Sequence, residues 1–283
     1  MVSVRWKDAL WQGCGLQVWE ESRTFAPNLN NTGTLMNTSD CLVIIPTYNE
    51  RENIEQIIRA VLALEQGFHI LVIDDGSPDG TASIVKGMME GDCAGRLFIV
   101  ERQGKLGLGT AYIAGFKWAL ERSYRFFFEM DADFSHDPKD LPRLYKAVAE
   151  DGAGVAVGSR YVSGVNVVNW PMGRVLMSYY ASKYVRLITG LPVHDTTAGF
   201  VCYSREVLEA IDLDAVRFKG YAFQIEMKFT AHRLGFRVAE VPVIFVNRRL
   251  GTSKMSGGIF SEALFGVIAL RWRAMTGKIK RKN

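Results

Sequence analysis

The sequence predicts an α/β fold with a mostly parallel, Rossmann-like sheet and helices on both faces. Short apolar runs typical of buried strands alternate with segments that have the apolar spacing of helices. Polar residues directly follow three of these runs, as in parallel sheets that bind a ligand at the carboxyl ends of their strands. The length of 283 residues, with 48% hydrophobic residues, is sufficient for such a domain.

The first 160 residues alternate strand patterns with helix patterns. Continuous apolar runs indicate strands buried on both faces, and apolar residues three and four apart indicate helices. We expect strands at 42–45, 70–73, 97–100, 126–130 and 154–157, and helices at 52–64, 81–89, 107–121 and 141–150. In the second half we expect helices at 171–189 and 221–233, and a strand at 238–246 that Pro242 makes edge-like or irregular.

Two aspartates directly follow the strand expected at 126–130. Asp131 and Asp133 are two residues apart, so an extended backbone points both carboxylates to one side. Like charges placed together favour a cation between them, and Mg²⁺ or Mn²⁺ prefers oxygen ligands. A solvated turn is the alternative for an isolated pair. Polar residues also follow two other strands, at 46–50 and 74–75, and this convergence favours a metal-held diphosphate.

Basic residues supply counter-charge for phosphate. Arg160 follows the strand at 154–157, and Arg174 comes fourteen residues later. Arg249 and Lys254 lie in a glycine-containing segment after the late strand. Arginine suits phosphate because its fork binds two oxygens at once. For any one of these residues alone a surface charge is the favoured explanation, and the closely spaced basic residues after the late strand are what favour a phosphate site.

Three further polar residues have open roles. Asp195 is either a helix N-cap or a catalytic base. Gln224 and Glu226 are two residues apart in an expected helix, so only one of them can face a given site.

Composition and the chain ends narrow the class of protein. The net charge of +4 suits anionic substrates or an anionic membrane surface. The four cysteines form no CxxC pair, which is typical of reduced thiols in a cytosolic protein. Residues 1–35 show neither a secretory signal nor clear periodicity, so we expect an extension at 1–38, with Met36 as the natural start. No apolar run is long enough for a transmembrane helix.

The C-terminal segment, 257–283, predicts an amphipathic helix with a basic end. Apolar residues recur between 259 and 270, and Trp272 and six Lys or Arg residues lie between 271 and 282. This pattern is typical of a helix at a membrane interface. The alternative is a terminal helix packed on the core with a solvated tail. The remaining residues, 39–256, would form the catalytic domain.

Seven segments in order resemble the inverting glycosyltransferases of family 2, which have the GT-A fold, and within them the dolichyl-phosphate or polyprenyl-phosphate mannose synthases. Residues 40–270 carry the resemblance. The segments are Pro-Thr-Tyr-Asn-Glu at 46–50, Asp-Asp-Gly-Ser-Pro-Asp-Gly-Thr at 74–81, Gly-Lys-Leu-Gly-Leu-Gly-Thr-Ala at 104–111, Asp-Ala-Asp-Phe-Ser-His at 131–136, Gly-Ser-Arg-Tyr at 158–161, Tyr-Ala-Phe-Gln-Ile-Glu at 221–226 and Arg-Leu-Gly-Thr-Ser-Lys at 249–254.

The resemblance implies roles for residues at the matching positions. Pro46, Tyr48, Glu50 and Asp75 would hold the nucleoside of the donor. Asp131, Ala132 and Asp133 would form the turn at the diphosphate, with Mg²⁺ or Mn²⁺ on the two aspartates. Arg160 and Arg174 would meet the acceptor phosphate, and Arg249 and Lys254 would close over the donor phosphates. Some relatives have a metal-binding Gln where Ser135 stands, so a third protein ligand is not identified here.

The implied reaction transfers mannose from GDP-mannose to a polyprenyl monophosphate at the cytoplasmic face of a membrane. A phosphate acceptor is already an anion at pH 7, since its second pKa is about 6, so it attacks without a protein base. Asp195 would then orient Arg160 or the acceptor. One in-line displacement would invert the sugar linkage. A UDP-glucose-dependent transferase and a non-catalytic nucleotide-sugar-binding module are the alternatives, and no nucleic-acid partner is expected.

Overall fold

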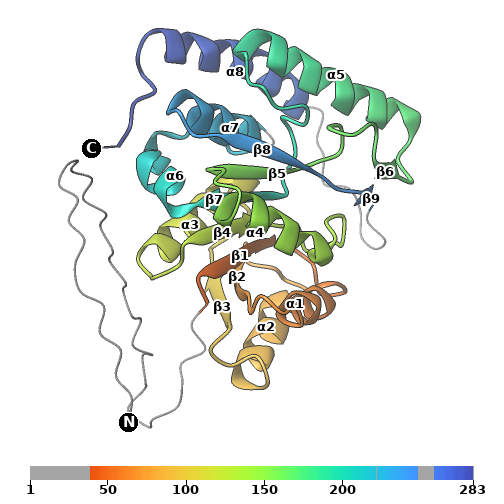
Figure 1. Ribbon diagram of the computed structural model, residues 1–283. Helices are drawn as coiled ribbons and strands as arrows, with labels where there is room; N and C mark the ends of the chain where they lie inside the picture. Colours follow the sequence, from red (N-terminus) through yellow and green to blue (C-terminus); the bar gives the residue numbers. More distant parts are fainter. Residues whose placement is uncertain (1–38, 221, 248–257, 283) are drawn as a thin grey trace, which may run out of the picture. The chain divides into compact units, whose positions relative to one another are not determined.

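A computed structural model describes residues 39–220, 222–247 and 258–282, with side chains from Phe265 onward in the last range. Seven strands form its central sheet in the order β3-β2-β1-β4-β7-β5-β8 (Figure 1). They are β1 (Cys41–Thr47), β2 (His69–Asp74), β3 (Leu97–Glu101), β4 (Phe126–Glu129), β5 (Val155–Ser159), β7 (Val201–Ser204) and β8 (Val238–Pro242). All neighbouring strands pair in parallel except β7, which is antiparallel to both β4 and β5.

Helices cover both faces of this sheet, as predicted. They are α1 (Ile54–Leu62), α2 (Thr81–Glu90), α3 (Leu108–Leu120), α4 (Leu141–Ala149), α5 (Met172–Thr189), α6 (Arg205–Ala210), α7 (Ala222–Arg233) and α8 (Gly258–Met275). One apolar core joins alternate strand residues to α1, α2 and α4, and a second joins the intervening residues to α3, α6 and α7. The strands are continuously apolar, without alternating polar residues, because each of them is buried on both faces of the sheet.

The second half of the chain adds two smaller features, a pair of short strands and a packed group of helices. The short strands β6 (Val167–Val168) and β9 (Phe245–Val246) pair in parallel outside the main sheet. Helices α5 and α8 pack against each other and against α7 around a third apolar cluster, which contains Val185, Phe229 and Leu270. No helix in the described ranges has both the length and the apolar content of a membrane span.

The fold class is confirmed, while some elements went unpredicted. The sequence analysis missed β6, β7 and α6, and so the antiparallel strand in the middle of the sheet. The irregular strand expected at 238–246 divides into β8, which is an edge strand ending at Pro242, and β9. The domain boundaries after residues 38 and 256 stay predictions; residue 256 itself lies outside the described residues.

Candidate active site at the carboxyl edge of the sheet

The polar loops after β1 and β2 are joined by a buried carboxylate, Asp74. Its Oδ1 accepts from the Thr47 hydroxyl at 2.9 Å and from the Ser77 hydroxyl at 2.6 Å, and its Oδ2 accepts from the Ser77 N–H at 2.9 Å. The Ser77 hydroxyl oxygen in turn accepts from the Asn49 N–H at 3.0 Å. Asp74 therefore holds the two loops together, which leaves its neighbour Asp75 as the carboxylate available for the site.

Asp75 is held by an arginine that the sequence analysis did not identify. Arg102, just after β3, reaches Asp75 Oδ1 with Nε at 2.7 Å and with Nη2 at 2.6 Å. Arg102 also donates to the Thr110 hydroxyl, at 2.9 Å, at the start of α3. Burial raises the pKa of Asp75, and the Arg102 guanidinium opposes that change. The carboxylate is thus fixed in direction by a partner on the neighbouring strand.

The other residues predicted to hold a nucleoside lie at this same edge. Pro46 is part of β1, and Tyr48 and Glu50 follow its end. The ammonium of Lys105 lies 5.4 Å from the centre of the Tyr48 ring, and the Glu50 carboxylate accepts from the Asn53 amide at 3.2 Å. The structure therefore gathers this predicted set at the ends of β1 and β2.

The paired aspartates form a tight turn after β4. The Asp133 carboxylate accepts the Ser135 N–H at 3.0 Å, and Ala132 is buried between the two aspartates. Phe134 has a φ of 58°, a left-handed conformation that is costly for a bulky residue, by about 1–3 kcal/mol. Such strain is found mainly where a site requires a fixed backbone.

His136 completes this turn, although the sequence analysis gave it no role. Its Nδ1 accepts the backbone N–H of Asp131 at 3.1 Å, so its proton is on Nε2. Burial lowers the pKa of His136 to about 4, although the nearby Asp133 opposes the shift. Its ring stacks on Phe200 with centroids 4.8 Å apart. His136 is therefore a neutral positioning residue at pH 7. Its place three residues after Asp133 was the available signal.

Arg160 and Asp195 form a fully buried ion pair beside the turn. Asp195 accepts from the Arg160 backbone N–H at 2.9 Å, from Nε at 2.6 Å and from Nη2 at 2.6 Å. Arg160 also donates to the Thr197 hydroxyl at 3.0 Å. Burial alone would raise the pKa of Asp195, but Arg160 outweighs it and holds that pKa below its ordinary value. Asp195 is thus an ionised orienting group and a weak base.

Aromatic rings connect Arg160 to the aspartate turn and to Arg174. The Phe245 ring lies 5.4 Å from His136 and 5.2 Å from Trp170, and the Arg160 guanidinium lies 5.5 Å from Phe245. The Arg174 guanidinium lies 3.9 Å from the Trp170 ring. Cation–π contacts of this kind hold guanidinium planes in place. The two predicted acceptor arginines therefore share one aromatic wall, whose rings the sequence did not single out.

Helix α7 resolves the choice between its two polar residues. Gln224 is buried toward the sheet beside Glu129, whereas Glu226 turns away. Glu226 accepts from Arg273 of α8 at 2.7 Å and from the backbone N–H groups of Arg217 and Phe218. The two side chains therefore point to different neighbours, as their spacing predicts, and Gln224 is the one that lies toward the sheet.

The structure does not place two of the predicted basic residues, and among the described residues it identifies no third side-chain ligand for the metal. Arg249 and Lys254 lie outside the described residues. Within the described part of the chain, no cluster of three or more His, Cys, Asp or Glu side chains could hold a metal ion. Asp131 and Asp133 stay the predicted ligands, and the Ser135 backbone, through its N–H, fixes the direction of Asp133.

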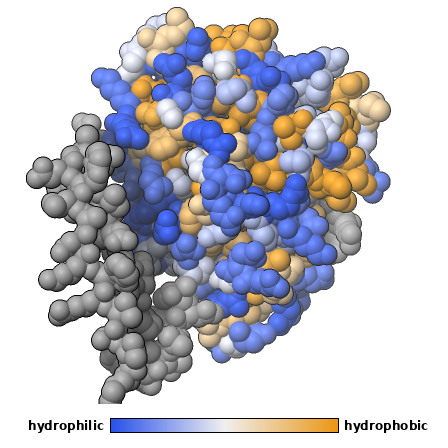
Figure 2. All heavy atoms as spheres, in the orientation of Figure 1, coloured by the Kyte–Doolittle hydropathy of each residue, from blue (hydrophilic) through white to orange (hydrophobic). Residues whose placement is uncertain are grey.

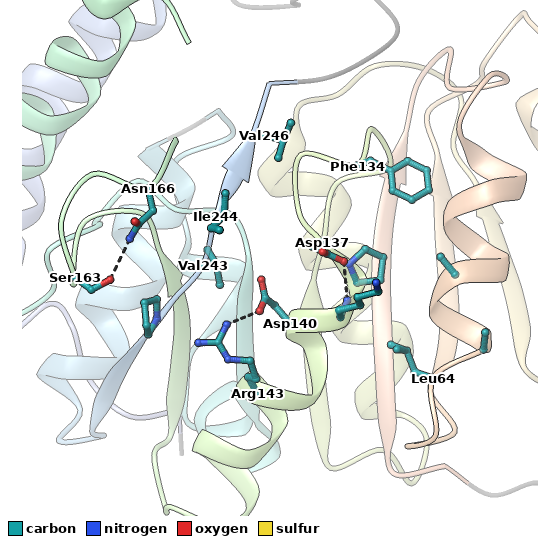
Figure 3. Close-up of a pocket in the computed structure, with 15 residues that line it drawn as sticks. Leu64, Phe134, Asp137, Asp140, Arg143, Ser163, Asn166, Val243, Ile244 and Val246 are labelled. Carbon is teal, nitrogen blue, oxygen red and sulfur yellow. Dashed lines mark hydrogen bonds and ion pairs between the residues drawn. The ribbon is translucent and has the colours of Figure 1, made fainter. Parts of the chain in front are cut away.

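A separate cavity of about 950 Å³ lies behind the aspartate turn (Figure 3). Phe134 lines it together with Leu64 of the α1 end, Arg143 of α4 and Ile244 near β9. An ion pair between Arg143 and Asp140 crosses its floor. None of the predicted catalytic residues that the structure describes (Asp131, Asp133 and Arg160) lines this cavity, so it is distinct from the described site at the sheet edge.

Comparisons with known proteins show a family match over the centre of the chain. The model for glycosyl transferase family 2 matches residues 42–212. A polyprenol monophosphomannose synthase from Mycolicibacterium smegmatis is 50% identical over 234 residues, which cover 83% of this chain and 88% of that protein. An undecaprenyl-phosphate mannosyltransferase from Micrococcus luteus is 46% identical over 242 residues, covering 84% and 98%.

Solved structures show the same fold at lower identity. Glucosyl-3-phosphoglycerate synthase from Mycobacterium tuberculosis, in complex with Mn²⁺, UDP and its product, matches with a TM-score of 0.58 at 20% identity. The match covers 83% of this chain and 79% of that one. The same enzyme with Mn²⁺, UDP-glucose and phosphoglyceric acid also gives a TM-score of 0.58. These similarities show that the fold is shared.

Proposed function

The chain belongs to glycosyl transferase family 2, and we propose that it transfers mannose from GDP-mannose to a polyprenyl monophosphate with inversion. Two relatives with nearly full-length coverage are named for mannose transfer to lipids of this class. The observation that carries the proposal is the aspartate turn beside the buried Arg160–Asp195 pair, linked by His136 and Phe245. A diphosphate donor and a phosphate acceptor require such neighbouring sites.

The donor would lie over β1, β2 and β4. Tyr48, Glu50 and Asp75 would bind the nucleoside, because these residues follow the paired ends of β1 and β2. Asp131 and Asp133 fit a Mg²⁺ or Mn²⁺ ion, since two carboxylates on one tight turn provide the oxygen ligands that these ions prefer. When bound, the ion would neutralise charge on the leaving diphosphate. Arg249 and Lys254 are proposed to assist from the segment that follows β9.

The acceptor phosphate would lie between Arg160 and Arg174. Asp195 directs the Arg160 guanidinium, and Trp170 holds Arg174 by stacking. The acceptor phosphate is an anion at pH 7, with a second pKa of about 6, so it needs no proton removed before it attacks. Consistent with this, Asp195 is saturated by Arg160 and has a lowered pKa, so it orients the site without acting as a base.

A peripheral membrane position at the cytoplasmic face is part of the proposal. Helix α5 exposes Met172, Leu176, Tyr180 and Leu187 along one stripe, opposite its buried Val185. Helix α8 likewise exposes apolar residues and buries others on its opposite face. Those exposed are Phe265, Ile268, Trp272 and Met275, and those buried are Val267, Leu270 and Ala274. Orange side chains gather at the top of Figure 2, over these two helices. Apolar stripes with basic residues nearby suit an anionic lipid surface.

The structure supports the packed reading of the C-terminal helix, and its exposed face is compatible with the proposed lipid contact. One face of α8 packs on α5 and α7, and its Arg273 is bonded to Glu226, so part of the basic end is structural. The tail also follows the protein body, because the Lys282 N–H donates to the Ala210 carbonyl at 2.9 Å. The proposed lipid contact therefore rests on the exposed apolar stripes more than on the basic tail.

A radiolabelled transfer assay tests the function. GDP-mannose and UDP-glucose would each be supplied with a short polyprenyl phosphate, with and without EDTA. We expect labelled lipid from GDP-mannose only, and its loss with EDTA. Product from UDP-glucose alone would replace the donor assignment, undiminished product with EDTA would remove the metal, and no product from either donor would contradict the proposed reaction.

A further inference from the structure

A lysine with no role in the proposed chemistry lies buried behind the site. Lys228, on α7, has 0% of its surface exposed, and its ammonium donates to the Ala198 carbonyl at 2.6 Å. Removing an ammonium from water costs several kcal/mol, and an apolar residue of the same size is often more stabilising at such a position. A contribution to folding stability therefore explains poorly why a lysine occupies this position.

Two buried carboxylates lie within electrostatic reach of Lys228. One is Glu129, the last residue of β4, two positions before Asp131 and fully buried. The other is Asp195, the partner of Arg160. Burial lowers the pKa of Lys228 to about 8, while Glu129 and Asp195 oppose that change. The ammonium, bonded to the Ala198 carbonyl, is thus within electrostatic range of both the strand that carries the aspartate turn and the pair that carries the acceptor arginine.

The loop at 195–199 connects Lys228 to the acceptor site mechanically. At its start, Asp195 and Thr197 both bind the Arg160 side chain. The backbone N–H of Asp195 donates to Glu240 of β8 at 3.0 Å. At its end, Ala198 accepts from Lys228. Among the hydrogen bonds of the described residues, the bond from Lys228 is therefore the one that ties this loop to α7 through a charged side chain.

The surroundings of this lysine are rich in buried polar atoms. The Glu129 carboxylate and the Gln224 amide lie side by side without hydrogen-bond geometry, and the hydroxyl groups of Tyr112 and Tyr203 have no partner among the described residues. Lys228 is thus a charged donor among buried polar groups that make few hydrogen bonds with one another in the described part of the chain.

We infer that Lys228 is a positioning residue of the acceptor site: it holds the loop at 195–199, and through Asp195 it sets the direction of the Arg160 guanidinium. This inference rests on the proposed function for its kinetic consequence, but its structural part does not. Removing the ammonium leaves the Ala198 carbonyl without its donor, so the end of the loop that carries Asp195 and Thr197 is held less firmly. The Arg160 fork then gains freedom, and acceptor binding weakens.

The test compares Lys228→Met with Phe229→Leu. Phe229 is the next residue on α7 but belongs to the cluster with α5 and α8, so its change costs packing and alters no charge. In ¹⁵N spectra, the Arg160 Nε–H bonded to Asp195 should shift or broaden in Lys228→Met and stay unchanged in Phe229→Leu. In transfer assays, the acceptor KM should rise at least tenfold in Lys228→Met alone, with the donor KM unchanged.

Each result has a defined meaning. An unchanged Arg160 signal in Lys228→Met, or equal acceptor KM values in both variants, would overturn the inference. Should Lys228→Met fail to fold, Lys228→Gln removes the charge but keeps an amide donor, so it should shift the Arg160 signal in the same direction by a smaller amount, and no shift would overturn the inference. If the wild type transfers no sugar, the proposed reaction fails, while the Arg160 signal still decides whether Lys228 positions the pair.

Discussion

The donor half and the acceptor half of the site are built in different ways. Around β1 to β4, short polar loops hold one another through carboxylate and hydroxyl bonds, such as those of Asp74. Around β5, β7 and α5, a buried ion pair and stacked rings hold the site, and partners such as Arg174 and Asn247 are 73 residues apart in the chain. The first half joins the ends of neighbouring strands that are 27 residues apart in the chain, whereas the second joins segments separated by 35 to 73 residues.

The largest effect should come from breaking the buried pair of the acceptor half. Arg160→Met leaves Asp195 as a buried charge without its main partner, which typically costs about 3–5 kcal/mol of unfolding free energy. Urea denaturation would measure it. Arg143→Met is the control, because its pair with Asp140 is partly exposed and is worth at most about 1 kcal/mol. Equal losses in both variants would remove the proposed difference between buried and exposed pairs.

In the donor half, the expected effect is on activity and not on folding. Asp133→Asn keeps an acceptor for the Ser135 N–H but removes the charge that would bind the ion. We expect transfer to fall by about 10²–10³-fold, the usual effect of losing a charge-stabilising group, with an unchanged melting temperature. Asp137→Asn, four residues later and exposed, should retain activity. Wild-type activity in Asp133→Asn would overturn the assignment of the turn.

A smaller effect, on the acceptor KM but not on the donor KM, is expected when the aromatic wall of the acceptor half is changed. Trp170→Leu removes the ring that stacks on Arg174, so the acceptor KM should rise about tenfold while the donor KM stays constant. Trp118→Leu is matched, because Trp118 stacks with Arg122 at 3.6 Å on α3, away from the site. Steady-state kinetics with each substrate varied in turn would measure both. A change in the donor KM alone would contradict the assignment of Trp170 to the acceptor half of the site.

The smallest effect concerns the surface of the acceptor half. Leu187 on α5 is 83% exposed, so Leu187→Glu should leave the fold intact while reducing sedimentation with anionic vesicles severalfold. Leu106→Glu provides the control in the donor half, where Leu106 is 59% exposed. If the two substitutions reduce vesicle binding equally, α5 has no special part in lipid contact.

The difference between the halves also explains what the sequence could predict. Asp75, Asp131 and Asp133 follow apolar runs, and parallel strands bring such ends to one edge, so their grouping was predictable. The four-residue strand β7 was not, because it is short and its pairing with β4 and β5 joins distant segments. The bonds it helps to position, such as those of Asp195, depend on the same pairing.

The sequence also did not indicate which charged residues are buried. Glu129 and Lys228 resemble ordinary polar residues at a strand end and on a helix, and only the packing of α7 on the sheet shows that both are fully buried. His136 and Arg102 were visible in or near the recognised segments, but their hydrogen bonds to the Asp131 backbone and to Asp75 required coordinates. The sequence therefore indicated the type of site, and the structure identified the residues that hold it.

The stereochemistry of the product tests the central claim most directly. If the two halves hold the diphosphate and the lipid phosphate face to face, a single displacement must invert the sugar. NMR of lipid formed from GDP-α-mannose should show a β-mannosyl phosphate. An α-linked product would contradict the account, because it requires a second displacement and a nucleophile that the described site does not provide.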